Sequence, residues 1–233
     1  MVVLTRKNKD SFMIKFFGSL FVGLFLAYTS ASAQNVAVSK DEARIWANQK
    51  GQELIHAIGM KNIIEKHSIL DKMLVEDVNL DYISKFVIGK YGKKMNKEQK
   101  RRYNSLFKRY ILSLYKRFNL NFETKDINFS VENISEHPRF TSVSCLIDAS
   151  KIIDKVEVEK IPVDFKLIRG DKGRIQAVDL EISNVSMVIE YRKKFYKMLQ
   201  EENEVIDWFL EKFESKVIAN EDAIEQISYN IQY

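Results

Sequence analysis

The sequence predicts an α+β domain, in which helices at both ends of the chain flank a run of consecutive strands. Apolar residues recur every three or four positions from Ser39 to about Phe118, every second position from Asp126 to Ser183, and every three or four again from Val188 onward. Helices and strands that are segregated in this way are typical of an antiparallel sheet covered by helices. We therefore expect N-terminal helices, a four-stranded, mainly antiparallel sheet, and C-terminal helices.

Residues 1–33 have the three zones of a cleavable signal peptide. An apolar run from Phe16 to Tyr28 is followed by the small residues Ala31–Ala33, and it is preceded by the basic residues Arg6, Lys7, Lys9 and Lys15. A membrane anchor would need about 20 apolar residues, whereas this run has 13. We expect cleavage after Ala33, and export of a mature protein that begins at Gln34.

Removal of this leader lowers the net charge of the chain from +5 to +2, because the leader carries four of the basic residues and Asp10. A nearly neutral, exported protein is a poor candidate for binding nucleic acid. Scarce Gly and Pro indicate one domain, residues 34–219. The tail, residues 220–233, fits either a short helix or a mobile end. Cys145 is the only cysteine, so no internal disulfide can form, and its alternating context predicts a buried strand position.

Four helices are expected before the sheet. Ser39 and Glu42 form a capping box that begins a helix running to about Ile58. Further helices are predicted over residues 62–74 and 81–90. The fourth begins at Asn96, with Gln99 in the capping position, and carries an apolar stripe of Tyr103, Leu106, Phe107, Tyr110, Ile111, Leu114 and Phe118.

A basic segment extends from just before this fourth helix to its end. From Lys90 to Arg117 there are eleven Lys or Arg residues against the single acid Glu98. For an exported protein, such a surface fits anionic lipid headgroups or an acidic protein partner. An ordinary solvated helix face fits equally well.

Alternating apolar residues predict four strands, over residues 127–131, 143–147, 163–167 and 178–182. Gly170–Gly173 has the composition of a tight turn, so the last two strands are expected to form a hairpin. Helical periodicity then predicts helices over residues 188–199 and 206–217. The inward-facing aromatic residues fit either a solid core or a cavity.

The sequence contains no recognisable catalytic pattern. His56, His67 and His137 lack the spacing of a zinc site, no Ser lies in a G-x-S-x-G motif, and Gly89–Lys93 lacks the spacing of a phosphate-binding loop. We therefore expect no enzyme activity, no metal and no cofactor.

Four segments carry a resemblance to a known family: Asp81–Tyr91, Glu98–Arg101, Val178–Ile182 and Val185–Phe195. In order and spacing they resemble the MlaC family of periplasmic phospholipid-binding proteins, also called toluene-tolerance proteins. The chain departs from the family pattern where Trp or Gly is usual, at Gly92, at Arg174 or Ile175, and at Asn184.

The resemblance implies a monomeric periplasmic carrier that encloses phospholipid in an apolar cavity. Such a carrier shuttles lipid between the inner and outer membranes and maintains outer-membrane lipid asymmetry. Its implied partners are an inner-membrane ABC transporter complex with a lipid-binding subunit, of which it is the substrate-binding component, and an outer-membrane lipoprotein complex. The expected lipid contacts are Phe86, Phe107, Tyr110, Leu114, Phe165, Leu167, Leu180, Val188 and Tyr191, with Arg192 or Lys193 beside the phosphate.

Three alternatives stay open at this point. The carrier would suit a hopanoid or another rigid polycyclic lipid if the cavity is altered. A non-carrying adaptor of a membrane complex would have a filled core. A hydrolase would need a polar cluster in the cavity, and the sequence offers none.

Overall fold

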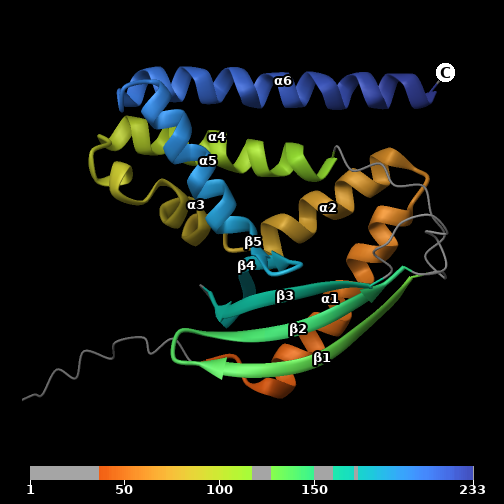
Figure 1. The fold of residues 1–233 in the computed structure, drawn as a ribbon. Coiled ribbons are helices and arrows are strands. Elements are labelled where there is room, and N and C mark those ends of the chain that lie inside the picture. The colour runs from red at the N-terminus through yellow and green to blue at the C-terminus, as the bar shows by residue number, and fades with distance from the viewer. Residues whose placement is uncertain (1–36, 117–126, 150–159, 171–172, 233) are drawn as a thin grey trace, which may run out of the picture. The chain divides into compact units, whose positions relative to one another are not determined.

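The computed structural model describes residues 37–116, 127–149, 160–170 and 173–232. The predicted signal peptide therefore lies outside the described residues, as do Arg117 and Phe118 at the end of the predicted fourth helix. The predicted α+β class is confirmed, and Figure 1 shows the helices and the sheet. No described helix is both long and apolar enough to cross a membrane.

The N-terminal part consists of α1 (Lys40–Gly59), α2 (Ile63–Asp77), α3 (Leu80–Ile88), the short 3-10 helix η1 (Gly89–Lys93) and α4 (Lys97–Lys116). Both predicted capping boxes are present. Glu42 N–H donates to Ser39 Oγ at 3.4 Å while Ser39 N–H donates to Glu42 Oε2 at 3.1 Å. Asn96 and Gln99 exchange the equivalent bonds at 2.9 and 3.0 Å. Local side-chain chemistry thus sets the start of α1 and α4.

The sheet has five strands in the order β1–β2–β3–β4–β5, and every neighbouring pair is antiparallel. They are β1 (Asn128–His137), β2 (Phe140–Asp148), β3 (Lys160–Arg169), β4 (Ile175–Ile182) and β5 (Val185–Ser186). The predicted hairpin between β3 and β4 is confirmed. The prediction of four strands missed β5, because a strand of two residues shows no alternation.

Ser183 and Asn184 explain why β5 exists. Their φ angles are 49° and 64°, which suits the tight turn that joins two antiparallel strands. Val185 consequently pairs with Ile182, and Ser186 with Glu181. Ser186 then begins α5 (Met187–Glu201), because its hydroxyl accepts a hydrogen bond from Ile189 N–H at 3.3 Å.

The last helix, α6 (Ile206–Gln232), runs beside α4 (Figure 1). Two ion pairs join these helices, from Arg102 to Glu214 and from Arg109 to Glu221, each at 2.6 Å. Residues 220–232 continue α6. This part of the tail, predicted to be either a short helix or a mobile end, is therefore helical.

The described residues contain two hydrophobic clusters. The helical cluster is built by α3, η1, α4, α5 and α6 with the end of α2, and its aromatic members are Tyr91, Tyr103, Phe107, Tyr110, Phe195, Phe209 and Phe213. The sheet cluster joins α1 to the strands through Val38, Ala43, Ala47, Ile134, Val143, Cys145, Leu167 and Ala177. Cys145 is buried in a strand, as predicted.

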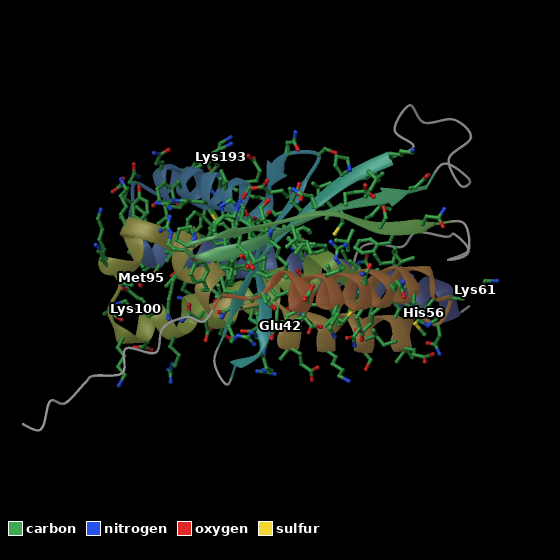
Figure 2. The ribbon with its side chains drawn as sticks, turned by 90° about the horizontal axis from the view of Figure 1, so that it is seen from below. Glu42, His56, Lys61, Met95, Lys100 and Lys193 are labelled. Atoms are coloured by element: carbon green, nitrogen blue, oxygen red, sulfur yellow. The ribbon has the colours of Figure 1, made fainter. Side chains whose placement is uncertain are left out.

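Small residues allow α1 to approach the sheet closely. A Cβ atom added to Gly51 would lie only 2.4 Å from the ring of Phe129, so no larger side chain fits there without a shift of that ring. Figure 2 shows α1 beside the strands, with Glu42 and His56 near its two ends.

Candidate functional site

An apolar pocket lies where the two clusters meet. The helical cluster lines it with Leu74, Ile83, Ile111 and Val188, and the sheet cluster lines it with Ala177 and the adjoining Trp46 and Phe165. Its free space is about 130 Å³. Because the walls belong to different clusters, the width of the pocket depends on how those clusters are spaced.

Four of the predicted contact residues line this pocket: Phe165, Leu180, Val188 and Tyr191. Phe165 on β3 meets the ring of Trp46 on α1 edge to face, with 5.7 Å between ring centroids. Tyr191 on α5 packs edge to face on Tyr110 at 6.4 Å. Burial raises the pKa of the Tyr191 hydroxyl to about 12, so this residue stays neutral at physiological pH.

The other predicted contacts lie elsewhere. Phe107 and Tyr110 are buried in the helical cluster, and Leu114 packs against it. Leu167 is buried in the sheet cluster. The apolar stripe of α4 thus faces mainly α5 and α6, and of its described residues only Ile111 lines the pocket.

Phe86, Arg192 and Lys193 also lie outside the pocket lining. The Arg192 guanidinium lies over the ring of the exposed Phe86 at 5.0 Å and over that of Tyr196 at 5.1 Å. Lys193 is exposed and forms an ion pair with Glu190 at 2.6 Å. These contacts place Arg192 between α5 and α3, and Lys193 on the exposed side of α5.

The first two helices supply much of the lining that sequence reasoning missed, namely Trp46, Leu54, Leu70, Met73 and Leu74. The predicted apolar face of residues 62–74 contained Leu70 and Leu74, but periodicity does not identify the neighbour of that face. For α1, the available signal was the repeat of small residues at Ala43, Ala47 and Gly51, which marks a close helix contact.

Two charged residues at the pocket neutralise each other. Lys50 Nζ lies 2.9 Å from Asp77 Oδ2 and also 2.9 Å from Glu53 Oε2. Burial raises the pKa of Asp77 and outweighs the opposing effect of Lys50. Burial alone would lower the pKa of Lys50, but hydrogen bonds to the two carboxylates raise it overall. The ammonium group therefore stays charged and paired.

A third charged residue of the lining, Asp179, has a structural task. Its carboxylate accepts hydrogen bonds from Ser186 Oγ at 2.7 Å and from Val188 N–H at 3.3 Å, at the start of α5. A carboxylate at a helix N-terminus is stabilised by the free N–H groups there. Lys166 Nζ adds an ion pair at 3.1 Å, so Asp179 fixes α5 against the sheet.

The pocket is apolar, lies at the junction of a sheet and a helical layer, and has its charges paired. Such a pocket is typical of domains that bind apolar molecules. Within the described ranges, no three or more His, Cys, Asp or Glu residues are grouped to hold a metal ion. The family model of the MlaC protein matches residues 52–215. The chain belongs to the MlaC family, which confirms the resemblance drawn from its sequence.

The fold is also similar to that of a solved structure, a phospholipid-binding protein from Ralstonia solanacearum in complex with a phospholipid. The TM-score is 0.58 at 12% sequence identity, over 76% of this chain and 98% of that one. At such low identity the likeness shows a shared fold. A comparison with curated protein sequences found no match.

Proposed function

We propose that this protein binds a phospholipid, with its acyl chains in the pocket between the two clusters. The observation that carries the proposal is the position of this apolar pocket in a member of the MlaC family. A phospholipid-bound protein of the same fold supports it. The apolar walls and the paired charges suit hydrocarbon, which makes no hydrogen bonds.

The energetics agree with this role. Each CH₂ group transferred from water contributes about 0.8 kcal/mol, so a chain of about 16 carbons contributes on the order of 12 kcal/mol. A ligand site for a molecule of this size usually encloses about 300–1,000 Å³. The free space of about 130 Å³ is well below that range. We therefore propose that lipid binding widens the pocket, by moving apart the walls that the helical cluster and the sheet cluster contribute.

The finer role that we propose is a periplasmic carrier, which transfers phospholipid between the inner and outer membranes as the substrate-binding component of an ABC-type transport system. The basic, apolar and small-residue zones of residues 1–33 support export. Family membership supports the role in lipid transport. The narrow pocket favours one competitor, an adaptor that carries no lipid.

Organic extraction of the purified protein followed by mass spectrometry separates these functions. We expect phospholipid in a stoichiometric amount, and transfer of labelled phospholipid from vesicles to the protein. A polycyclic lipid in the extract would instead assign a different ligand. An extract without lipid, together with no transfer, would favour the adaptor and contradict the proposal.

A pair of variants tests the location of the chains. Leu180→Gln places an amide in the pocket wall, and Ile64→Gln makes the same kind of change at a side chain that is 66% exposed on α2. Burying an unpaired amide against hydrocarbon costs about 1–3 kcal/mol, so we expect about tenfold weaker phospholipid binding for Leu180→Gln. Ile64→Gln should bind as the unmodified protein does. Equal binding by both variants, with unchanged thermal unfolding, would place the chains elsewhere.

A further inference from the structure

A second hollow adjoins the apolar pocket. It has a free volume of about 450 Å³ and is lined by the end of α2, the start of α3, and residues of α4 and β4. Val78 and Leu80 line both hollows, so they form a ridge with the apolar pocket on one side and this groove on the other. The groove differs from the pocket in its charge.

Three cations line the groove: Lys85 on α3, Lys108 on α4, and Arg174 just before β4. Among the residues that the structure describes, the only carboxylate in its lining is that of Asp81. All three cationic side chains are exposed, and none has a hydrogen bond or ion pair among the described residues. The described part of the lining thus carries an excess of two positive charges.

Other basic residues nearby differ from these three because they form ion pairs. Arg102, Arg109 and Lys116, on the same α4 helix as Lys108, form ion pairs with Glu214, Glu221 and Asp71. Lys94 pairs with Glu204 at 2.9 Å. Part of the basic segment is therefore neutralised within the protein, while the cations around the groove keep their charge available for a ligand.

The ridge between the hollows is held firmly. Asn79 N–H donates to the Ala177 carbonyl oxygen at 2.9 Å, and Val78 forms a bridge with Ala177 on β4. The Gln176 side chain accepts from Asn79 Nδ2 and donates to the Glu76 carbonyl oxygen, each at 3.1 Å. These bonds fix the α2–α3 connection to the sheet, so the cationic groove and the apolar pocket keep a constant spacing at this ridge.

We infer that this groove binds the phosphate of a lipid headgroup, and that the protein consequently prefers phospholipids with a net negative headgroup. The inference rests on the proposed function. A guanidinium binds phosphate oxygens in pairs, and two ammonium groups add point charges. A zwitterionic headgroup brings its own cation into this positive groove, and that cation already compensates the phosphate charge. A headgroup without a cation leaves the phosphate charge to interact with Lys85, Lys108 and Arg174.

The test compares two triple variants of the mature protein with the same change in charge. The groove variant is Lys85→Gln/Lys108→Gln/Arg174→Gln. The control, Lys97→Gln/Lys100→Gln/Arg101→Gln, alters exposed cations at the start of α4 that do not line the groove. Uptake of labelled phosphatidylglycerol and phosphatidylcholine from separate vesicles is measured at low and high salt.

We expect the unmodified protein and the control to prefer phosphatidylglycerol, and the groove variant to lose about tenfold of that preference, because each exposed ion pair contributes a factor of a few. Uptake of phosphatidylcholine should fall by less than that of phosphatidylglycerol, and salt should weaken the preference. A groove variant that keeps the preference, or a control that loses as much, would overturn the inference.

Inorganic phosphate separates failure of this inference from failure of the proposed function. If neither lipid is taken up, the proposed function fails, and with it the assignment of the groove to a headgroup. Amide shifts of groove residues on titration with inorganic phosphate, absent in the groove variant, would then assign the groove to free phosphate. No shifts would refute an anion site of either kind.

Discussion

The carboxylate of Glu42 connects the start of α1 to the sheet. It accepts two hydrogen bonds from Arg169 Nη2 at 2.7 and 2.8 Å, and one from Ser39 N–H at 3.1 Å. The hydrogen bond from Arg169, followed by those from Ser39, lowers the pKa of Glu42 to about 2 from its usual 4.5. A single residue thus caps a helix and joins that helix to β3.

The low pKa of Glu42 predicts a pH dependence of stability. The folded state favours the ionised form, so its contribution to stability is complete above pH 4.5 and is lost as the pH falls toward about 2. We expect Glu42→Gln to flatten the fall of the melting temperature across this window. The control is Glu65→Gln, which changes an exposed carboxylate on α2. Parallel pH profiles for the unmodified protein and Glu42→Gln would contradict the assignment.

Two glycines with positive φ differ in their surroundings and make a second test. Gly89 ends α3 at φ 48°, where a Cβ atom would lie 2.3 Å from the Tyr196 hydroxyl. Gly173 has φ 75° and nothing within 4 Å of that position. A left-handed backbone costs a residue with a Cβ about 1–2 kcal/mol, and overpacking adds about 1–3 kcal/mol. Urea unfolding should therefore show a larger loss for Gly89→Ala than for Gly173→Ala, and equal losses would refute the clash.

At the scale of elements, the contact between α4 and α6 combines aromatic packing with ion pairs. The ring of Phe213 on α6 is fully buried, with its centroid 4.8 Å from that of Phe195 and 5.4 Å from that of Tyr110. Beside it, the Arg109 guanidinium pairs with Glu221 at the surface. Both interactions join the same helices, but burial makes their expected energies different.

We expect Phe213→Ala to lower the free energy of unfolding by about 3–5 kcal/mol, because it opens a cavity in a packed core. Arg109→Ala should cost no more than about 1 kcal/mol, because its ion pair is partly exposed and screened by solvent. Equilibrium urea unfolding of the two variants measures both values. A cost for Arg109→Ala as large as that for Phe213→Ala would mean that the ion pair, rather than the rings, holds α6.

The elements themselves were largely predictable because their signals are local. Ser39 with Glu42, Asn96 with Gln99, and the alternation around Cys145 each act within a few residues, and the structure contains all three features. β5 escaped prediction because its pairing depends on the backbone of Ser183 and Asn184, which alternation does not describe.

The pocket was predictable only in part, because its lining depends on which faces meet. Phe165 and Val188 were expected and do line the pocket, whereas Phe107 looks equally apolar in the sequence and packs in the helical cluster against Phe195 of α5 instead. The wall from α1 depends on Gly51 and the neighbouring alanines, which bring Trp46 close to Phe165. Such long-range contacts produce no periodic pattern of residues in the sequence.

At the scale of the whole molecule, the N-terminal zones predict processing during export. We expect the protein from the periplasmic fraction to begin at Gln34, which intact-mass measurement can establish. Ala33→Tyr places a large side chain where signal peptidase needs a small one, so the precursor should accumulate. A substitution such as Ala37→Tyr, beyond the expected cleavage site, serves as the control. Recovery of periplasmic protein that still contains residues 1–33 would contradict cleavage.

The junction of the two hydrophobic clusters has a consequence for affinity. A ligand that fills more than about 130 Å³ inside the pocket has to push apart the walls that the helical cluster and the sheet cluster contribute. The work of that separation is subtracted from the free energy gained by burying the ligand, so the complex is weaker than its apolar contact area alone would give. The same work is recovered when the clusters close again. A narrow resting pocket therefore favours release of its contents, and release is as necessary to a carrier as capture.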